Sequence, residues 1–225
     1  MNLERLKIFW PRMMDDRYDT GHSVEGMFQA GSGETVLKNK LSLIDPNEMD
    51  EVELGLLVQL TDVVLGDVTN EQIITADDLR EWHRRSLGNV YDWAGHYRSV
   101  NMGKAEFHFA AAHLIPNLMK VLEKNFLSVY MPCKGMTDEA LIDALATVHI
   151  ELILIHPFRE GNGRLSRLLT NIMALQAGQP MLGFSVMDEQ KENYFSAVQA
   201  GLDNYEPMKS IFRQVLHEMQ QNAGG

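Results

Sequence analysis

Cysteine is nearly absent from this sequence of 225 residues, because Cys133 is the only one. A single thiol excludes an internal disulfide bond and the common zinc sites built from several cysteines. A chain without disulfides suits a reducing compartment, so we expect a cytoplasmic protein. Residues 1–16 mix charges with apolar side chains and lack the pattern of a secretory signal, so export by that route is not expected.

Basic residues and long apolar runs are also scarce. There are 20 Lys and Arg against 31 Asp and Glu, which gives a formal net charge of −11. Such a surface repels nucleic acid and anionic membranes. The most apolar stretches, residues 54–65 and 144–155, contain polar residues and fall short of the roughly 20 apolar residues that span a bilayer. We therefore expect neither nucleic acid nor membrane as a partner.

What the sequence does contain is a series of helix signals. Apolar spacing and capping residues predict helices over residues 46–65, 75–88, 112–129, 137–156, 164–177, 188–200 and 206–220. The helix over residues 137–156 has the broadest apolar face and is predicted to be the buried centre. Residues 97–100 and 106–109 alternate in the manner of a small hairpin. The predicted fold is all-α, or mainly α, with one short β-hairpin.

One segment between two predicted helices departs from the usual local rules. It reads HPFREGNGRLSR over residues 156–167. Gly161 and Gly163 allow consecutive N–H groups to turn inward at a helix start and hold an anion. Arg164 and Arg167 follow in the first helical turn, where cations oppose the helix dipole unless an anion lies between them. Two guanidinium groups in addition to the N–H groups indicate a chain of phosphates.

Other side chains of this segment suit the chemistry of a bound polyphosphate. Glu160 offers the hard oxygen ligand that phosphate-bound Mg²⁺ prefers. His156 can accept a proton near neutral pH and could activate a hydroxyl nucleophile. Phe158 is predicted to anchor the loop on the core. In the competing, purely structural interpretation the glycines form an ordinary turn, the arginines pair with surplus acids, and His156 ends a helix.

The segment resembles the signature of the Fic family, HxFx[D/E]GNGRxxR, at every specified position. A GxxxxGK[ST] phosphate loop is absent. Residues 91–101 are similar to the family's stretch before its flap hairpin, and residues 192–207 to the helices after the signature. The resemblance covers about residues 75–216. It implies a Fic-type helical domain and, most commonly, transfer of AMP from ATP to a hydroxyl of a target protein.

The resemblance implies a role for each signature position. His156 would deprotonate the target hydroxyl, and Glu160 would hold Mg²⁺ on the phosphates of ATP. The implied nucleotide-binding residues are Gly161, Asn162, Gly163, Arg164, Arg167 and Tyr194. Among these, the Asn162 side chain would help to bind phosphate, Arg164 would contact the β-phosphate and Arg167 the γ-phosphate. Tyr194 would contact the base or would serve only in packing.

The resemblance also places a flap over residues 104–109, headed by Lys104. An exposed hairpin edge there could dock a segment of the target protein as an added strand. Phe107 and Phe109 share one face of the predicted hairpin, so in the alternative interpretation they only pack on the core.

An inhibitory glutamate is a further feature that the resemblance implies. Many family members hold a glutamate of the motif [S/T]xxxE[G/N] against the second signature arginine, which blocks productive ATP binding. The best candidate here is residues 21–26, GHSVEG, which would place Glu25 against Arg167. The motif's serine or threonine position is occupied by Gly21.

The predicted organisation is an N-terminal extension over residues 1–45, a catalytic domain over residues 46–220 and a frayed tail over residues 221–225. Two other functions stay open. The same fold could use another nucleotide donor or remove AMP from a modified target, or the chain could be a non-catalytic nucleotide-sensing module. The target protein, the modified Ser, Thr or Tyr, and the formation of a homodimer are not determined by the sequence.

Overall fold

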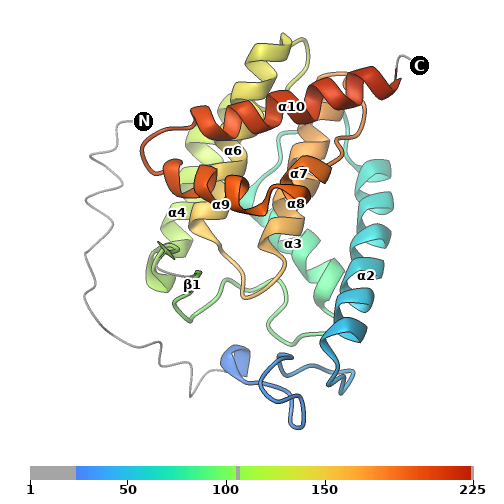
Figure 1. Cartoon of the computed structure of the whole chain (residues 1–225), viewed down its shortest axis with the longest axis vertical. Coiled ribbons are helices and arrows are strands. Elements are labelled where there is room, and N and C mark those ends of the chain that lie inside the picture. The colour runs from blue at the N-terminus through green and yellow to red at the C-terminus, as the bar shows by residue number, and fades with distance from the viewer. Residues whose placement is uncertain (1–23, 105–106, 224–225) are drawn as a thin grey trace.

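The fold is organised around one helix, α6 (Asp138–Ile155), at the centre of the helical assembly (Figure 1). The helix begins at Thr137, whose hydroxyl oxygen accepts a hydrogen bond from the Ala140 N–H at 3.3 Å. Beyond its first turn nearly every residue is buried, as is typical of a helix that is apolar all round. The prediction of a buried central helix is confirmed.

The computed structural model describes residues 24–104 and 107–223. Besides α6, its elements are η1 (Val24–Gly26), α2 (Pro46–Asp67), α3 (Ala76–Leu87), β1 (Gly103–Lys104), β2 (Phe107–His108), η2 (Ala112–Leu114), α4 (Ile115–Leu122), the π-helical turn η3 (Glu123–Leu127), α5 (Ser128–Tyr130), α7 (Asn162–Gln176), α8 (Ser185–Glu189), α9 (Lys191–Ala200) and α10 (Glu206–Ala223). Helices α7 and α10 pack on α6, and α2 packs on α3. The predicted mainly α fold is confirmed.

None of the helices in the described ranges combines the length and the apolar character that a membrane crossing requires.

Local sequence accounts for the helix starts. The Asp45 side chain accepts a hydrogen bond from the Asn47 N–H at the head of α2, and Pro46 occupies the first turn. Thr75 and Asp78 form a reciprocal capping box at the head of α3. These short-range contacts explain why the starts of both helices could be predicted.

The flap hairpin is smaller than predicted. Gly103 pairs with His108 and Lys104 with Phe107, whereas residues 97–100 form no strand. The prediction of a strand over 97–100 is wrong, because the Arg98 N–H donates to the Pro157 carbonyl of the signature loop instead of to a hairpin partner.

Several helices differ from the prediction at their ends or in their interior. The single helix predicted over 112–129 is divided into η2, α4, the π-helical turn η3 and α5. α7 begins at Asn162, two residues early, because Gly161 already caps it. The helix predicted over 188–200 is divided into α8 and α9 at Gln190, which has φ of −108° and ψ of 49°. α10 continues to Ala223, past the predicted domain end at residue 220, and residues 224–225 lie outside the described part.

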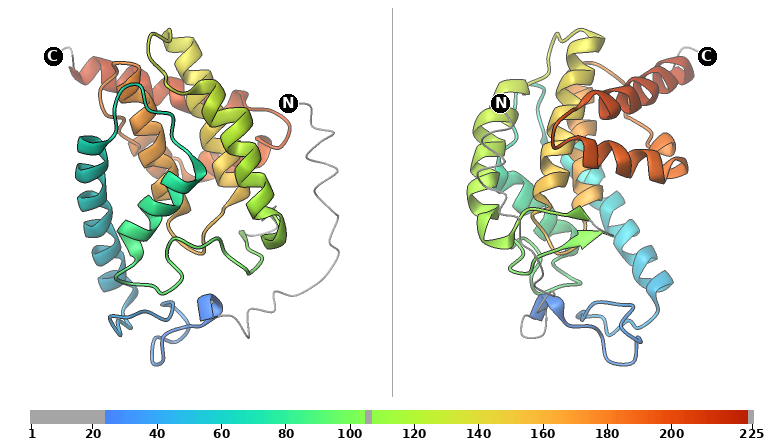
Figure 2. Two further views of the ribbon diagram at one scale, coloured as in Figure 1. Left: turned by 180° about the vertical axis from the view of Figure 1, so that it is seen from behind. Right: turned by 60° about the vertical axis from the view of Figure 1, so that its left-hand side comes forward.

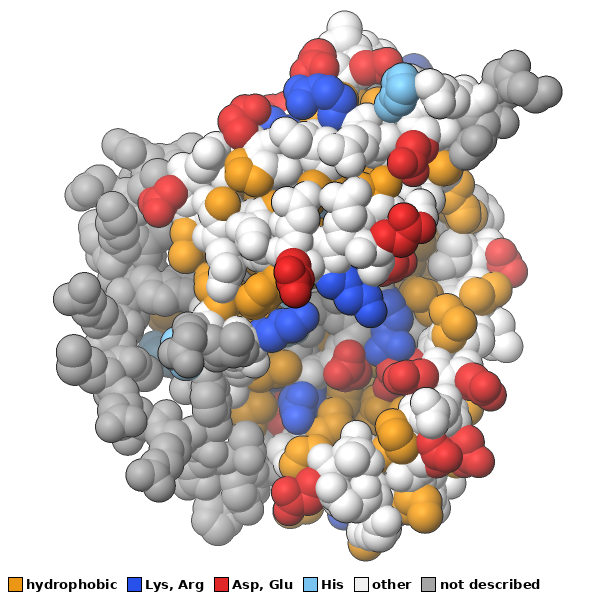
Figure 3. Space-filling model, viewed as in Figure 1, with side chains coloured by type: hydrophobic (Ala, Val, Ile, Leu, Met, Phe, Trp, Pro, Cys, Tyr) orange, Lys and Arg blue, Asp and Glu red, His pale blue; other side chains and the backbone are white. Residues whose placement is uncertain are grey.

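The signature loop, the flap and the N-terminal stretch over residues 24–45 lie toward the same end of the molecule (Figure 2). Their proximity is recorded in two contacts. The carboxylate of Glu25 binds Ser99, ahead of the flap, and its carbonyl accepts a hydrogen bond from Arg159 of the loop. On the face seen in Figure 3, Lys and Arg side chains gather in a hollow below α8 and beside α2. The acidic chain therefore carries a local basic region.

Candidate active site

The loop between α6 and α7 is bounded by two residues in left-handed conformations. His156, directly after α6, has φ of 49°, and Gly161, before α7, has φ of 81°. A left-handed conformation is ordinary for glycine and uncommon for histidine. The turn at Gly161 starts α7 at once, so the first N–H groups of that helix lie beside the loop as donors for an anion.

The His156 side chain is held as a neutral imidazole. Its Nδ1 lies 3.2 Å from the Ile153 carbonyl oxygen, which can only accept, so the ring proton sits on Nδ1 and the lone pair on Nε2. The ring stacks on Phe109 with centroids 3.8 Å apart. Burial lowers the pKa of His156 to about 4, and the positive charges of Arg98 and Arg159 act in the same direction. Nε2 is therefore able to accept a proton at neutral pH.

Glu160 is the acidic side chain of the loop. One of its oxygens, Oε1, accepts a hydrogen bond from the Gly161 N–H at 2.9 Å and lies 3.4 Å from Arg164. Within the described ranges, no three His, Cys, Asp or Glu side chains are grouped closely enough to bind a metal ion by themselves. One partly exposed carboxylate beside the predicted phosphate site fits Mg²⁺, which is commonly bound by one or two carboxylates together with substrate phosphates.

The two signature arginines already have carboxylate partners. Arg164 pairs with Glu53 of α2, a buried residue that also accepts a hydrogen bond from the Tyr91 hydroxyl at 2.6 Å. Arg167 makes a bidentate ion pair with Asp188 of α8: its Nη2 donates to Oδ1 at 2.7 Å and its Nη1 to Oδ2 at 3.2 Å. A phosphate that binds these guanidinium groups must share or displace those carboxylates. None of these partners was predicted.

The predicted contact between Glu25 and Arg167 is wrong. The carboxylate of Glu25 accepts a 2.6 Å hydrogen bond from the Ser99 N–H and a second, shorter one from the Ser99 hydroxyl. Its carbonyl oxygen accepts from Nε of Arg159 at 3.0 Å. These nearby donors satisfy Glu25, while Asp188 takes the place that Glu25 was expected to fill. Residues 21–23 of the candidate motif lie outside the described part of the chain.

The Asn162 side chain is hydrogen-bonded within the loop. Its amide nitrogen donates to the Phe158 carbonyl at 2.7 Å, and its amide oxygen accepts from the Phe158 N–H at 2.9 Å. The residue is buried. The side chain therefore closes the loop on Phe158, and its contact with phosphate stays a prediction. The main-chain N–H groups of Gly161, Asn162 and Gly163 stay as the proposed hydrogen-bond donors to phosphate.

Tyr194 lies at an interface of three helices. Its hydroxyl is hydrogen-bonded to Nε2 of the fully buried His149 at 2.8 Å, and Nδ1 of His149 meets the Ser166 hydroxyl at 2.8 Å. Burial raises the pKa of Tyr194 to about 12 and lowers that of His149 to about 3. The hydroxyl thus joins α9 to α6 and α7, and contact with a nucleotide base stays a prediction.

Both flap phenylalanines have aromatic neighbours. Phe107 is buried and meets Phe109 and Phe195 edge-on, with centroids 5.5 and 6.0 Å away. Phe109 covers His156. Lys104 lies over the Phe195 ring at 4.9 Å, and β1 is exposed. The flap therefore anchors itself through its phenylalanines and leaves the main chain of β1 accessible. Residues 105–106 lie outside the described ranges.

Arg98 was not predicted as a site residue, yet it connects the flap to the loop. Its buried guanidinium donates to the carbonyl oxygens of His156, Val100 and Ala110, each at 2.6 Å, and to that of Ile155 at 3.3 Å. Two of these acceptors end α6, where the helix dipole favours a cation. The other two flank the hairpin. Its position within residues 91–101, the stretch similar to the family, was the only signal for it.

Replacing Arg98 by methionine should lower the free energy of unfolding by about 3 kcal/mol, because several buried carbonyls lose their donor. Urea denaturation of both proteins would measure the difference. Arg98→Lys keeps the charge and can reach only part of the acceptors, so an intermediate loss is expected. Equal stability of the methionine variant and the original chain would contradict this assignment.

Comparisons with known proteins agree with this geometry. Residues 73–174 match the profile of the Fic/DOC family. "Protein adenylyltransferase Fic" of Nematostella vectensis is 35% identical over 142 residues, which are 62% of this chain and 31% of that protein. The chain thus spans about a third of that relative's length. "Probable protein adenylyltransferase Fic" of Escherichia coli strain K12 is 26% identical over 83% of this chain and 90% of its own length.

A solved structure gives the same result at the level of the fold. The crystal structure of BepC from Bartonella tribocorum, with bound AMPPNP, superimposes with a TM-score of 0.65 and 27% identity. The match covers 81% of this chain and 93% of that one.

Proposed function

Since the chain belongs to the Fic/DOC family, we propose that it transfers AMP from ATP to a hydroxyl side chain of a target protein. The observation that carries the proposal is a neutral imidazole, with its lone pair on Nε2, beside a helix start that holds two arginines. A protein that only binds a nucleotide does not need a general base in this position. Relatives named adenylyltransferases and a neighbour that binds AMPPNP support ATP as the donor.

The proposed reaction is a displacement at the α-phosphorus of ATP. The target hydroxyl gives its proton to Nε2 of His156, and its oxygen bonds to the α-phosphorus while the bond to the β-phosphate oxygen breaks. Pyrophosphate leaves. Arg164, Arg167 and the N–H groups at the start of α7 offset the charge of the phosphates, so positioning and electrostatics do most of the work. Mg²⁺, when bound, would neutralise further phosphate charge, and Glu160 would hold it.

ATP labelled separately at the α- and γ-phosphates tests this reaction. Label from the α-phosphate should appear on protein, and label from the γ-phosphate should be released as pyrophosphate. Transfer of the γ label would indicate a kinase-like reaction. ATP binding without transfer of either label, with target-containing lysate present, would favour the nucleotide-sensing alternative. UTP and GTP in the same assay examine donor choice.

Asp188 is expected to restrain nucleotide binding, because it occupies the Arg167 guanidinium that the γ-phosphate would use. Asp188→Asn should therefore lower the dissociation constant for ATP by up to about fivefold, since partly exposed ion pairs contribute up to about 1 kcal/mol. Isothermal titration calorimetry measures the change. Glu189→Gln, the matched control, removes the same charge from the next residue of α8.

Glu25→Gly separates this restraint from the one predicted by sequence. If Glu25 were the inhibitor, its loss would raise ATP affinity and self-modification. Because Glu25 instead binds Ser99, we expect the glycine variant to bind ATP no more tightly than the original chain. An increase with Glu25→Gly and none with Asp188→Asn would contradict this assignment.

A further inference from the structure

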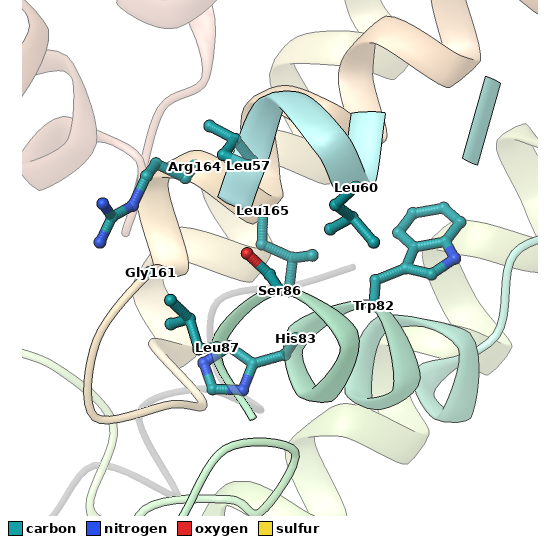
Figure 4. A pocket seen from close by; sticks show the side chains of 9 residues that line it. All are labelled: Leu57, Leu60, Trp82, His83, Ser86, Leu87, Gly161, Arg164 and Leu165. Atoms are coloured by element: carbon teal, nitrogen blue, oxygen red, sulfur yellow. The ribbon is translucent and has the colours of Figure 1, made fainter. Parts of the chain in front are cut away.

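His83 lies on α3 directly beneath the signature loop. Its side chain is buried, with 2% of its surface exposed, and it lines a cavity of about 20 Å³ together with Gly161 and Arg164 (Figure 4). The histidine is 77 residues from Glu160 in the sequence. Nothing in the proposed reaction uses this ring directly, yet its contacts all lead to the loop or to the stretch ahead of the flap.

Both nitrogens of the His83 ring have defined partners. The Gly95 N–H donates to Nδ1 at 2.8 Å, and Nε2 lies 3.0 Å from the main-chain carbonyl oxygen of Glu160. A backbone N–H can only donate, so Nδ1 is an acceptor and the ring proton is on Nε2. His83 therefore donates a hydrogen bond to Glu160, and the opposite tautomer would face two mismatched partners.

The ring also packs closely on the residues around Glu160. It stacks on Phe158 with ring centroids 3.9 Å apart and an interplanar angle of 8°. A side chain at Gly161 would come within 3.7 Å of the His83 ring and 3.2 Å of Leu87. The imidazole thus supports three positions of the loop, 158, 160 and 161, with one rigid group.

We propose that His83 is a positioning residue of the phosphate-binding loop. By fixing the main-chain carbonyl of Glu160, it sets the direction of the Glu160 carboxylate and of the N–H groups that start α7. The inference rests on the proposed function, because it assigns the loop to a Mg²⁺-bound triphosphate. His83 itself touches neither the nucleotide nor the target.

Two substitutions divide the ring's two hydrogen bonds between them. His83→Gln places an amide donor near the position of Nε2, so it can keep the bond to Glu160. His83→Asn places an acceptor near the position of Nδ1, so it can keep the bond from Gly95 and loses the one to Glu160. The two amides have the same chemistry, and neither retains the stack on Phe158. They therefore form a matched pair for the Glu160 contact.

The glutamine variant should retain most AMP transfer, whereas the asparagine variant should need at least tenfold more Mg²⁺ for half-maximal rate. Calorimetry with Mg²⁺ and ATP should show a tenfold weaker affinity for the asparagine variant only. The dependence of the rate on pH, which reports His156, should be unchanged in both. Equal Mg²⁺ requirement and equal nucleotide affinity in the two variants would overturn the proposal.

A measurement on the unaltered chain keeps the test valid if either variant fails to fold. Nitrogen-15 NMR of the imidazoles should find His83 with its proton on Nε2 and with a coupling to the Glu160 carbonyl. A proton on Nδ1 would overturn the inference. If the chain binds Mg²⁺ and ATP but transfers no AMP, the proposed function fails, while calorimetry and NMR still decide the role of His83.

Discussion

Replacing His156 by alanine is expected to lower the rate of AMP transfer at least a hundredfold, while ATP still binds. A positioned general base contributes about 10²- to 10⁴-fold to a reaction rate. No other imidazole in the described part of the chain lies in the signature loop, so the loss should not be replaced locally. Initial rates with α-labelled ATP measure the effect, and calorimetry measures binding.

The dependence of the rate on pH gives an independent check of the same base. Burial lowers the pKa of His156 to about 4, so the ring is neutral at pH 5 and above. The rate should therefore be nearly constant from about pH 5.5 to 8, and should fall only as the pH approaches 4. A rate that halves between pH 7 and 6 would indicate a different base. At pH values at which the alanine variant is still folded, its residual rate should show no acidic limb.

The folded chain is expected to lose stability steeply as the pH falls from about 6.5 toward 4. Burial lowers the pKa of His83 to about 4, that of His149 to about 3 and that of His156 to about 4. Their ordinary value is about 6.5. Above 6.5 these rings are neutral in both states and their contribution is fully present. Below pH 6.5 these rings bind protons in the unfolded chain but stay neutral in the folded chain, so unfolding is favoured.

The size of this effect follows from the number of protons. Near pH 5 the unfolded chain binds about three more protons at these rings, which corresponds to about 4 kcal/mol per pH unit. Glu151 acts in the opposite direction, because burial raises the pKa of its carboxyl group. We therefore expect a net loss below about 4 kcal/mol per pH unit near pH 5. Urea denaturation at pH 7, 6 and 5 measures the slope.

His149→Gln is the matched control for this slope. The fully buried His149 ring is bonded to Tyr194 and Ser166, so the variant should be less stable at pH 7. The slope of its stability against pH should nevertheless be smaller, because the unfolded variant takes up about one proton fewer than the unfolded original chain. A variant slope equal to that of the original chain would show that His149 is not among the groups that titrate on unfolding.

Local signals explain most of the secondary structure that could be predicted. Caps and turn residues act within a few positions of the chain, so Thr75, Asp78 and Thr137 mark helix starts without knowledge of the rest. The strand predicted over 97–100 failed for the complementary reason. Its alternating pattern was real, but a contact between Arg98 and Pro157, distant in the sequence, determined where its backbone hydrogen bond goes.

The candidate site shows the same division. Residues 156–167 are contiguous, so their proximity, the two glycines and the spacing of the arginines could be read directly from the sequence. Their partners could not, because Arg164 and Glu53 are 111 residues apart and Arg167 and Asp188 are 21 apart. The chain contains 31 acidic residues, and charge alone does not select which of them reaches a given arginine.

The sequence by itself determined the helical class, the central helix and the composition of the signature loop, since these depend on apolar periodicity and on neighbours in the chain. Only the tertiary structure decided that Asp188, and not Glu25, faces Arg167, and that His83 and Arg98 hold the loop from beneath and behind. Hydrogen-bond partners are chosen by distance and direction in space. Those depend on how all the helices pack together, which local pattern does not encode.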